Sequence, residues 1–140
     1  MTLMNDLVQR IFNAIIKQEG MPEEWTNPGN CRDCPWFPAD RDKEGNLTRD
    51  YPPTTKGVIT YVKYANGFWV PRTRGEGIAG GMHVVALRIA EGQSLVELIT
   101  AWAPPGDSNN TAAYIAHVKK WAKIPNKNIP LWNFIETEPK

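Results

Sequence analysis

The first twenty residues carry an apolar stripe with the spacing of one face of an α-helix. Apolar residues recur at intervals of three and four, and polar side chains fill the opposite face. Gly20 suits the left-handed conformation that ends many helices, and Pro22 follows as a stop signal. The pattern therefore predicts a helix whose last turn contains Glu19. The apolar positions are Leu3, Met4, Leu7, Val8, Ile11, Phe12, Ile15 and Ile16.

Glu19 is out of place in this pattern. An advance of about 100° per residue puts it roughly 20° from Val8, near the middle of the apolar stripe. Partial burial disfavours an ionised carboxylate, and the unpaired carbonyls at a helix end disfavour it further. A carboxylic acid that stays protonated near neutral pH is what a glycosidase uses as its general acid. The alternative is that Glu19 bends out to water or pairs with a Lys or Arg.

The middle of the chain predicts a long loop followed by a small antiparallel sheet. Residues 21–57 lack regular periodicity, and Pro28-Gly29 indicates a type II turn. A loop of this length in a small domain tends to be functional, and its aromatic residues favour an ordered conformation. Two runs rich in β-branched and aromatic residues, 58–64 and 68–70, flank Asn66-Gly67. This arrangement is the strongest short signal for a β-hairpin.

Three further helices are predicted after the hairpin, through residues 78–89, from 95 to 102 and through 114–121. Glycines 75–80 match G-x-G-x-x-G, but no βαβ repeat supports a dinucleotide fold, so they are interpreted as a flexible helix start. Ser94 caps the second helix, with Glu97 at the capping-box position. Asn109 or Asn110 caps the third. Residues 131–135 form a short last helix or a docked tail, and the expected fold is α+β, mainly α, in one domain covering residues 1–140.

Composition narrows the function classes. A chain of 140 residues with a formal net charge of +1 gives no sign of an electrostatic nucleic-acid binder. We expect no membrane span, because no apolar run is long enough, and no signal peptide, because a basic start and a continuous apolar run are lacking. Six Trp residues suit sugar binding, since a pyranose stacks its apolar face on an indole ring.

Cys31 and Cys34 form a lone C-x-x-C motif. Thioredoxin-like chemistry needs a helix after the first cysteine, which Pro35 disfavours. A zinc site would need two more ligands, and the chain offers only His83 and His117. A local disulfide or plain thiols are the preferred interpretations, and we expect neither a metal nor a cofactor.

Three stretches then bring in a resemblance: residues 14–20, residues 27–32, and 101–105 running into 109–114. Together they resemble lysozyme-like peptidoglycan-cleaving proteins of phages, which are similar to virion-associated muramidases and lytic transglycosylases. The resemblance implies a mostly helical lysozyme-like fold with Glu19 as the acid. It also implies a substrate cleft, lined by Asn27, Asn30, Arg32, Asn110 and Tyr114. This chain departs from the family pattern at 107–111 and in a longer loop at 33–53.

The implied activity is cleavage of the β-1,4 link between N-acetylmuramic acid and N-acetylglucosamine. The implied location is a phage particle, or the host cytoplasm with release to the cell wall. A hydrolase usually needs a second carboxylate to activate water, and Asp33 and Asp107 are candidates, with Asp40 and Asp50 in the same loop region. A lytic transglycosylase uses the sugar's own 6-hydroxyl and Glu19 alone. Candidate stacking platforms or orienting hydroxyls are Trp36, Tyr61, Tyr64, Trp69 and Trp102.

Two other function classes stay open. A Cys-His peptidoglycan peptidase would use Cys31 or Cys34, but a nucleophilic cysteine prefers a helix start, which the flanking prolines disfavour. A non-catalytic glycan-binding or structural virion protein with a lysozyme-like body is the other alternative.

Overall fold

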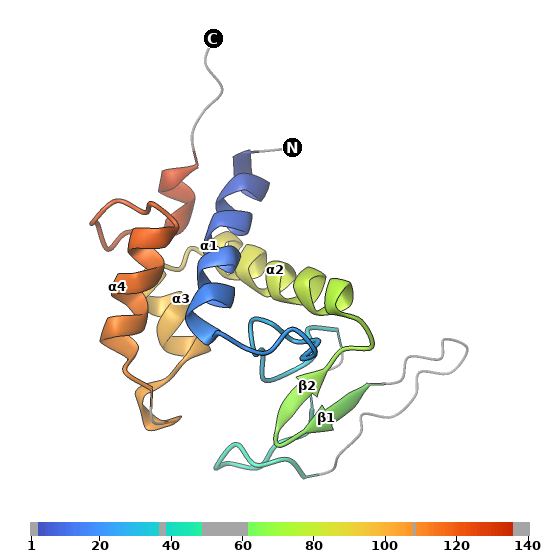
Figure 1. The fold of residues 1–140 in the computed structure, drawn as a ribbon. Coiled ribbons are helices and arrows are strands. Elements are labelled where there is room, and N and C mark those ends of the chain that lie inside the picture. Colours follow the sequence, from blue (N-terminus) through green and yellow to red (C-terminus); the bar gives the residue numbers. More distant parts are fainter. Residues whose placement is uncertain (1–2, 37–38, 49–61, 108, 136–140) are drawn as a thin grey trace. The chain divides into compact units, whose positions relative to one another are not determined.

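A computed structural model describes residues 3–36, 39–48, 62–107 and 109–135 of the chain. These residues are mainly helical, with one small two-stranded antiparallel sheet, which confirms the α+β, mainly α class (Figure 1). None of the helices in the described part is long and apolar enough to cross a membrane. The chain divides into two compact units, Met1–Gly20 with Met82–Lys140, and Met21–Gly81. We call them the helical unit and the loop unit; the lysozyme-like fold and the single domain stay predictions.

The helical unit begins with the predicted first helix, α1 (Leu3–Glu19). The middle of its apolar stripe is buried, with Leu7, Ile11 and Phe12 fully inaccessible to solvent. Gly20 has a φ of +58°, and its N–H donates to the carbonyl of Ile16 at 3.1 Å. The helix therefore ends in the left-handed glycine that the sequence predicts.

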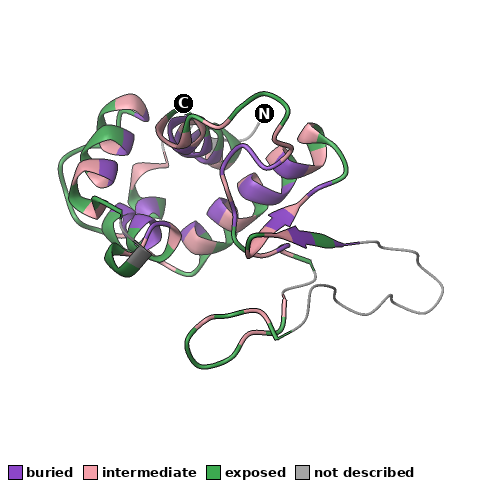
Figure 2. Cartoon of the chain, turned by 60° about the horizontal axis from the view of Figure 1, so that its bottom comes forward, coloured by how far each residue is buried: buried purple, intermediate pink, exposed green. Residues whose placement is uncertain are grey.

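Two more helices of the helical unit follow their predicted caps. Ser94 and Glu97 form a reciprocal capping box at the start of α3 (Leu95–Trp102). Asn110 caps α4 (Thr111–Trp121) by accepting a hydrogen bond from the N–H of Ala113. α4 packs against both α1 and α3, and the helices turn their buried sides inward (Figure 2). Two short 3₁₀ helices complete the unit, η1 (Pro105–Asp107) and η2 (Leu131–Phe134).

α2 (Arg74–Ala90) contains all the glycines of the G-x-G-x-x-G match, so they form the start of the helix, which begins before residue 78; their flexibility stays a prediction. Two of these glycines, Gly77 and Gly80, allow close packing. A Cβ at Gly80 would lie 2.5 Å from the indole ring of Trp69, and one at Gly77 would collide with the carbonyl of Thr26. Because Gly77 and Gly80 have no side chain, the first half of α2 can pack closely against Thr26 and Trp69 within the loop unit.

The predicted hairpin is present in the loop unit as β1 (Lys63–Ala65) and β2 (Phe68–Val70), with Tyr64 paired opposite Trp69. Asn66 and Gly67 both have positive φ, +53° and +83°, as a type I′ turn requires. Residues 58–61 of the predicted first run lie outside the described residues.

The turn at 27–30 closes with a hydrogen bond from the N–H of Asn30 to the carbonyl of Asn27, 2.9 Å. Its left-handed residue is Asn30, with φ +52°. A type II turn would place the positive φ on Gly29, so the predicted turn type is wrong.

Candidate active site

Glu19 and Tyr114 meet inside the helical unit. The Tyr114 hydroxyl donates a hydrogen bond to Oε2 of Glu19 at 2.8 Å. Tyr114 lies in α4 and is 3% exposed, whereas Glu19 is partly buried at the end of α1. The carboxylate therefore faces the packed side of its helix, where the apolar stripe predicts it. The phenol ring fixes one of its two oxygens, and the partial exposure leaves the group open to solvent.

α4 holds the whole last turn of α1 through three side-chain pairs in succession. Besides Glu19 with Tyr114, Oε1 of Gln18 lies 2.8 Å from Nδ1 of His117. The Nζ of Lys17 sits 4.5 Å from the ring centroid of Trp121, a cation–π contact. Tyr114, His117 and Trp121 follow a spacing of three and four, so they share one face of α4. This face of α4 positions the candidate acid. The sequence did not single out Lys17, Gln18, His117 and Trp121 as site residues. The helical spacing along α4 was the signal that could have indicated them.

Other predicted residues of the helical unit have structural contacts. Asn110 is the N-cap of α4, so its side chain helps to fix the helix that carries Tyr114. Trp102 is partly exposed and packs its ring on Phe12, with centroids 6.2 Å apart. The side chain of Asp107 lies outside the described residues.

Asn27 is fully buried in the loop unit, so the expectation that it lines a substrate cleft is corrected. Its amide Nδ2 donates to the carbonyls of Cys31, at 2.7 Å, and Trp69, at 2.9 Å. Its Oδ1 accepts a hydrogen bond from the N–H of Cys31 at 2.9 Å. One side chain thus joins the loop at Cys31 to strand β2, which is the role of a structural asparagine.

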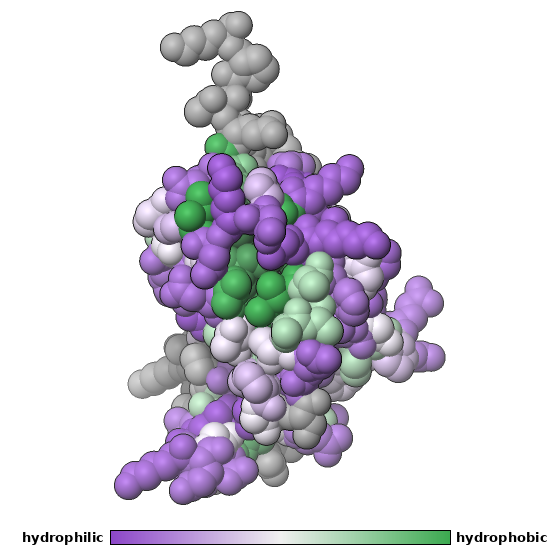
Figure 3. All heavy atoms as spheres, turned by 90° about the vertical axis from the view of Figure 1, so that its left-hand side faces the viewer, coloured by the Kyte–Doolittle hydropathy of each residue, from purple (hydrophilic) through white to green (hydrophobic). Residues whose placement is uncertain are grey.

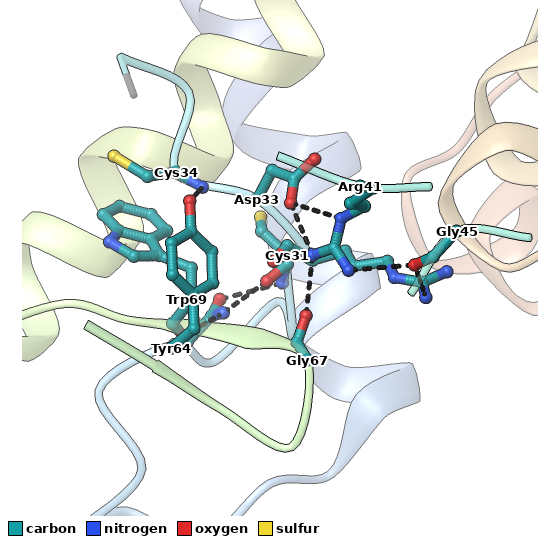
Figure 4. Close-up of polar contacts among 10 residues, drawn as sticks. Cys31, Asp33, Cys34, Arg41, Gly45, Tyr64, Gly67 and Trp69 are labelled. Carbon is teal, nitrogen blue, oxygen red and sulfur yellow. Dashed lines mark hydrogen bonds and ion pairs between the residues drawn. The ribbon is translucent and has the colours of Figure 1, made fainter. Parts of the chain in front are cut away.

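Asp33 forms an ion pair with Arg41, a residue that the sequence did not single out (Figure 4). Oδ1 of Asp33 accepts from both Nε and Nη2 of Arg41, at 2.9 and 2.6 Å. The same guanidinium donates to the carbonyls of Gly45 and Gly67. Arg32 is exposed and also donates to the Gly45 carbonyl, at 2.9 Å. These contacts tie the long loop to the hairpin turn, and a role for Asp33 as second carboxylate stays a prediction.

Two predicted aromatic platforms are buried, which corrects their assignment. Trp69 is 1% and Tyr64 is 6% exposed, so neither offers a face to a sugar. The Tyr64 hydroxyl accepts a hydrogen bond from the N–H of Cys34 at 3.3 Å, and burial raises the pKa of Tyr64 to about 12 (Figure 4). Trp36 remains a candidate platform, because it is 46% exposed, and its ring makes an edge-on contact with Trp69. Tyr61 lies outside the described residues.

The remaining polar candidates are Asn30 and the two cysteines. Asn30 accepts a hydrogen bond from the indole N–H of Trp25 at 3.3 Å. Cys31 and Cys34 are buried thiols without a disulfide between them. In the part of the chain that the structure describes, no group of three or more His, Cys, Asp or Glu side chains could hold a metal ion.

No family model, curated protein sequence or solved structure matches this chain. Among the candidate site residues of the helical unit, Glu19 and Tyr114 are a pair that the fold brings into contact.

Proposed function

We propose that this protein cleaves the glycan strands of peptidoglycan, between N-acetylmuramic acid and N-acetylglucosamine, with Glu19 as the general acid. The observation that carries the proposal is the hydrogen bond from the buried Tyr114 hydroxyl to Oε2 of a partly exposed carboxylate. A carboxylate on an exposed helix face would need no such support. The resemblance of residues 14–20, 27–32 and 101–114 to phage lysozyme-like proteins supports the same assignment.

In the proposed reaction, protonated Glu19 gives its proton to the glycosidic oxygen as the bond to the anomeric carbon breaks. Because Oε2 accepts the Tyr114 hydrogen bond, the transferred proton is assigned to Oε1. The positive charge that develops on the sugar ring is then quenched by an attacking hydroxyl. In a muramidase this hydroxyl belongs to water, and in a lytic transglycosylase it is the 6-hydroxyl of the same sugar. The attacking oxygen loses its proton to Glu19 or to a second carboxylate.

The contacts of Asp33 favour the route with one carboxylate. Its ion pair with Arg41 already accounts for its position in the loop unit. A site that relies on Glu19 alone is the transglycosylase arrangement, in which the same residue first donates and then recovers the proton. We therefore propose the transglycosylase reaction ahead of hydrolysis.

The test is digestion of purified peptidoglycan by the wild-type protein and by Glu19→Gln. Glutamine keeps an oxygen that can accept the Tyr114 hydrogen bond, so the fold should be retained. Its amide protons are not acidic enough to be transferred to the glycosidic oxygen. Loss of a general acid lowers the rate about 10²- to 10⁴-fold. Glu91→Gln is the matched control, because Glu91 follows the end of α2, is exposed and pairs only across one turn with Arg88. Its activity should equal that of the wild type.

Fragments from both wild type and Glu19→Gln would contradict Glu19 as the acid. Fragments from neither would favour the non-catalytic glycan-binding alternative. Mass spectrometry of the fragments then separates the two reactions, because a transglycosylase leaves anhydromuramic ends and a hydrolase leaves reducing ends.

A further inference from the structure

We propose that the C-terminal end of α4 and the last turn of α1 form a surface that binds the anionic substituents of the glycan strand next to Glu19. The inference rests on the proposed function, because it specifies the charge of the polymer on which Glu19 acts. We call this surface the cationic face. Its residues are Lys17, His117, Lys120, Trp121, Lys123 and Lys127.

Positive charge is concentrated around the end of α4. Residues 109–135 contain four of the 16 Lys and Arg residues and none of the 15 Asp and Glu residues, in a chain whose formal net charge is +1. Lys119 and Lys120 lie in the last turn of α4, where a cation also complements the helix dipole. Lys123 and Lys127 lie beyond the helix end, where that effect no longer explains them. The excess of positive charge therefore points to an anionic partner.

The chain folds back after α4 and brings these lysines together. The N–H of Ile124 bonds to the carbonyl of Lys119 at 3.0 Å, and Lys123 reverses the chain with a φ of +57°. The Nζ of Lys119 then donates to Oδ1 of Asn126 at 2.8 Å, which holds the following loop against α4. Lys120, Lys123 and Lys127 are exposed at this end of the helix. Figure 3 views the molecule from the side on which α4 lies, and hydrophilic side chains gather there around a smaller apolar area.

The cationic face is continuous with the surroundings of the candidate acid. Lys17 and His117 both contact the indole of Trp121, the imidazole at a centroid distance of 5.2 Å. His117 contacts Gln18, which is the residue before Glu19. The cationic face thus begins within one helical turn of Glu19, in the same unit. A polymer bound at Glu19 would bring the substituents of its neighbouring sugars to this face.

The position of the cationic face beside Glu19 also indicates which anionic partner it binds. Muramic acid carries a lactyl group whose attached peptides end in carboxylates, so the proposed substrate supplies the required negative charge itself. Phosphate polymers of the wall or anionic lipids would also meet positive charge. They give no reason for the face to join the last turn of α1. We therefore assign the face to the carboxylates of the strand that Glu19 cleaves.

The experiment measures binding in a protein that cannot cut. Glu19→Gln protein is co-sedimented, at low and high ionic strength, with peptidoglycan sacculi freed of phosphate polymers and with neutral chitin. Sacculi that retain phosphate polymers and phosphatidylglycerol vesicles are the two further probes. The test variant adds Lys120→Gln, Lys123→Gln and Lys127→Gln. The control variant makes the same charge change in the loop unit, with Lys43→Gln, Lys63→Gln and Arg72→Gln, all exposed positions. Thermal unfolding of both variants verifies the fold.

Each exposed ion pair contributes a few-fold to affinity, so the test variant should bind stripped sacculi about tenfold more weakly at low salt. The binding of the test variant to stripped sacculi should also depend much less on salt concentration than that of the parent protein. The control variant, and binding to chitin, should be unchanged. Equal loss with chitin, no loss with sacculi, or no binding of the parent protein to sacculi would overturn the inference. So would a loss seen only with sacculi that retain phosphate polymers, or an equal loss on phosphatidylglycerol vesicles.

These outcomes are separate from the failure of the proposed function. Because the binding protein lacks the acid, the affinities do not depend on cleavage. A wild-type protein that releases no fragments would contradict the proposed reaction while the binding result stands. A cutting enzyme with an unchanged test variant would contradict only the cationic face.

Discussion

At the scale of single residues, the hydroxyl of Tyr114 can be separated from its ring. Tyr114→Phe keeps the buried ring in α4 and removes the hydrogen bond to Glu19. Hydrogen bonds to carboxylates contribute about 1.5–3 kcal/mol, so kcat on peptidoglycan should fall roughly 10- to 100-fold. KM should change little, because the hydroxyl orients the acid and does not bind sugar. Steady-state turnover of sacculi measures both, and a variant with wild-type kcat would show that Tyr114 does not position Glu19.

Tyr64 gives a prediction about alkaline pH. Its pKa is raised from an ordinary value of 10.0 to about 12, chiefly by burial. The folded protein thus holds this proton more tightly than the unfolded chain. The stability that Tyr64 contributes is fully present below pH 10 and is lost as the pH rises to about 12. The difference in free energy of unfolding between wild type and Tyr64→Phe should be constant from about pH 8 to pH 10 and then shrink. Urea unfolding across this range measures it, and a difference independent of pH would refute the prediction.

At the scale of elements, two glycines of α2 form a matched pair. Gly80 faces the rigid indole of Trp69, whereas a Cβ at Gly75 would meet nothing nearer than a side-chain oxygen at 3.9 Å. Gly80→Ala should lower the free energy of unfolding by about 1–3 kcal/mol through overpacking. Gly75→Ala should leave it unchanged or raise it by up to about 1 kcal/mol, because alanine loses less entropy in a helix. Urea unfolding of both variants gives the two signs. A tolerated alanine at Gly80 would mean that Trp69 can move.

The helices and the hairpin could be predicted because their signals are local. The caps Ser94 and Asn110 and the turn residues Asn66-Gly67 each act within a few positions of the chain. The structure describes the first run of the hairpin and the loop at 33–53 only in part. Among the helix starts in the described residues, that of α2 was the hardest to predict, since the helix begins at Arg74 and includes its glycines.

The residues of the candidate site also differ in how far local sequence predicts them. Glu19 follows from periodicity within one helix. Its partner Tyr114 is 95 positions away, so that pairing follows from the packing of α4 on α1. Asn27 shows the opposite error, because the resemblance implied a cleft-lining residue where the structure has a buried one. Its burial depends on a contact with Trp69, 42 positions later, that local sequence does not encode.

At the scale of the whole molecule, the two units hold their folds by different means. The helical unit has a core of aliphatic and aromatic side chains, such as Leu7, Ile11 and Phe12. The loop unit has short strands, and side-chain hydrogen bonds from Asn27 and Arg41 join its segments. Unfolding free energies differ between such regions, and those with few buried apolar contacts open first. We therefore expect amide hydrogens of the loop unit to exchange faster than those of α1 and α4.

Asn27→Ala tests whether that difference is local. The substitution leaves the N–H of Cys31 and two carbonyls without their buried partner, and each unsatisfied group costs about 1–3 kcal/mol. Because the core of the helical unit does not include Asn27, the cost should fall on the loop unit. Native-state hydrogen exchange should speed up at Cys31 and along β2, while the amides of Ile11 and Val118 keep their wild-type rates. Asn30→Gly is the control, since glycine tolerates the positive φ of this position and Asn30 accepts only one long side-chain hydrogen bond among the contacts described above. Faster exchange at Ile11 and Val118, in step with Cys31, would show that the two units unfold as one.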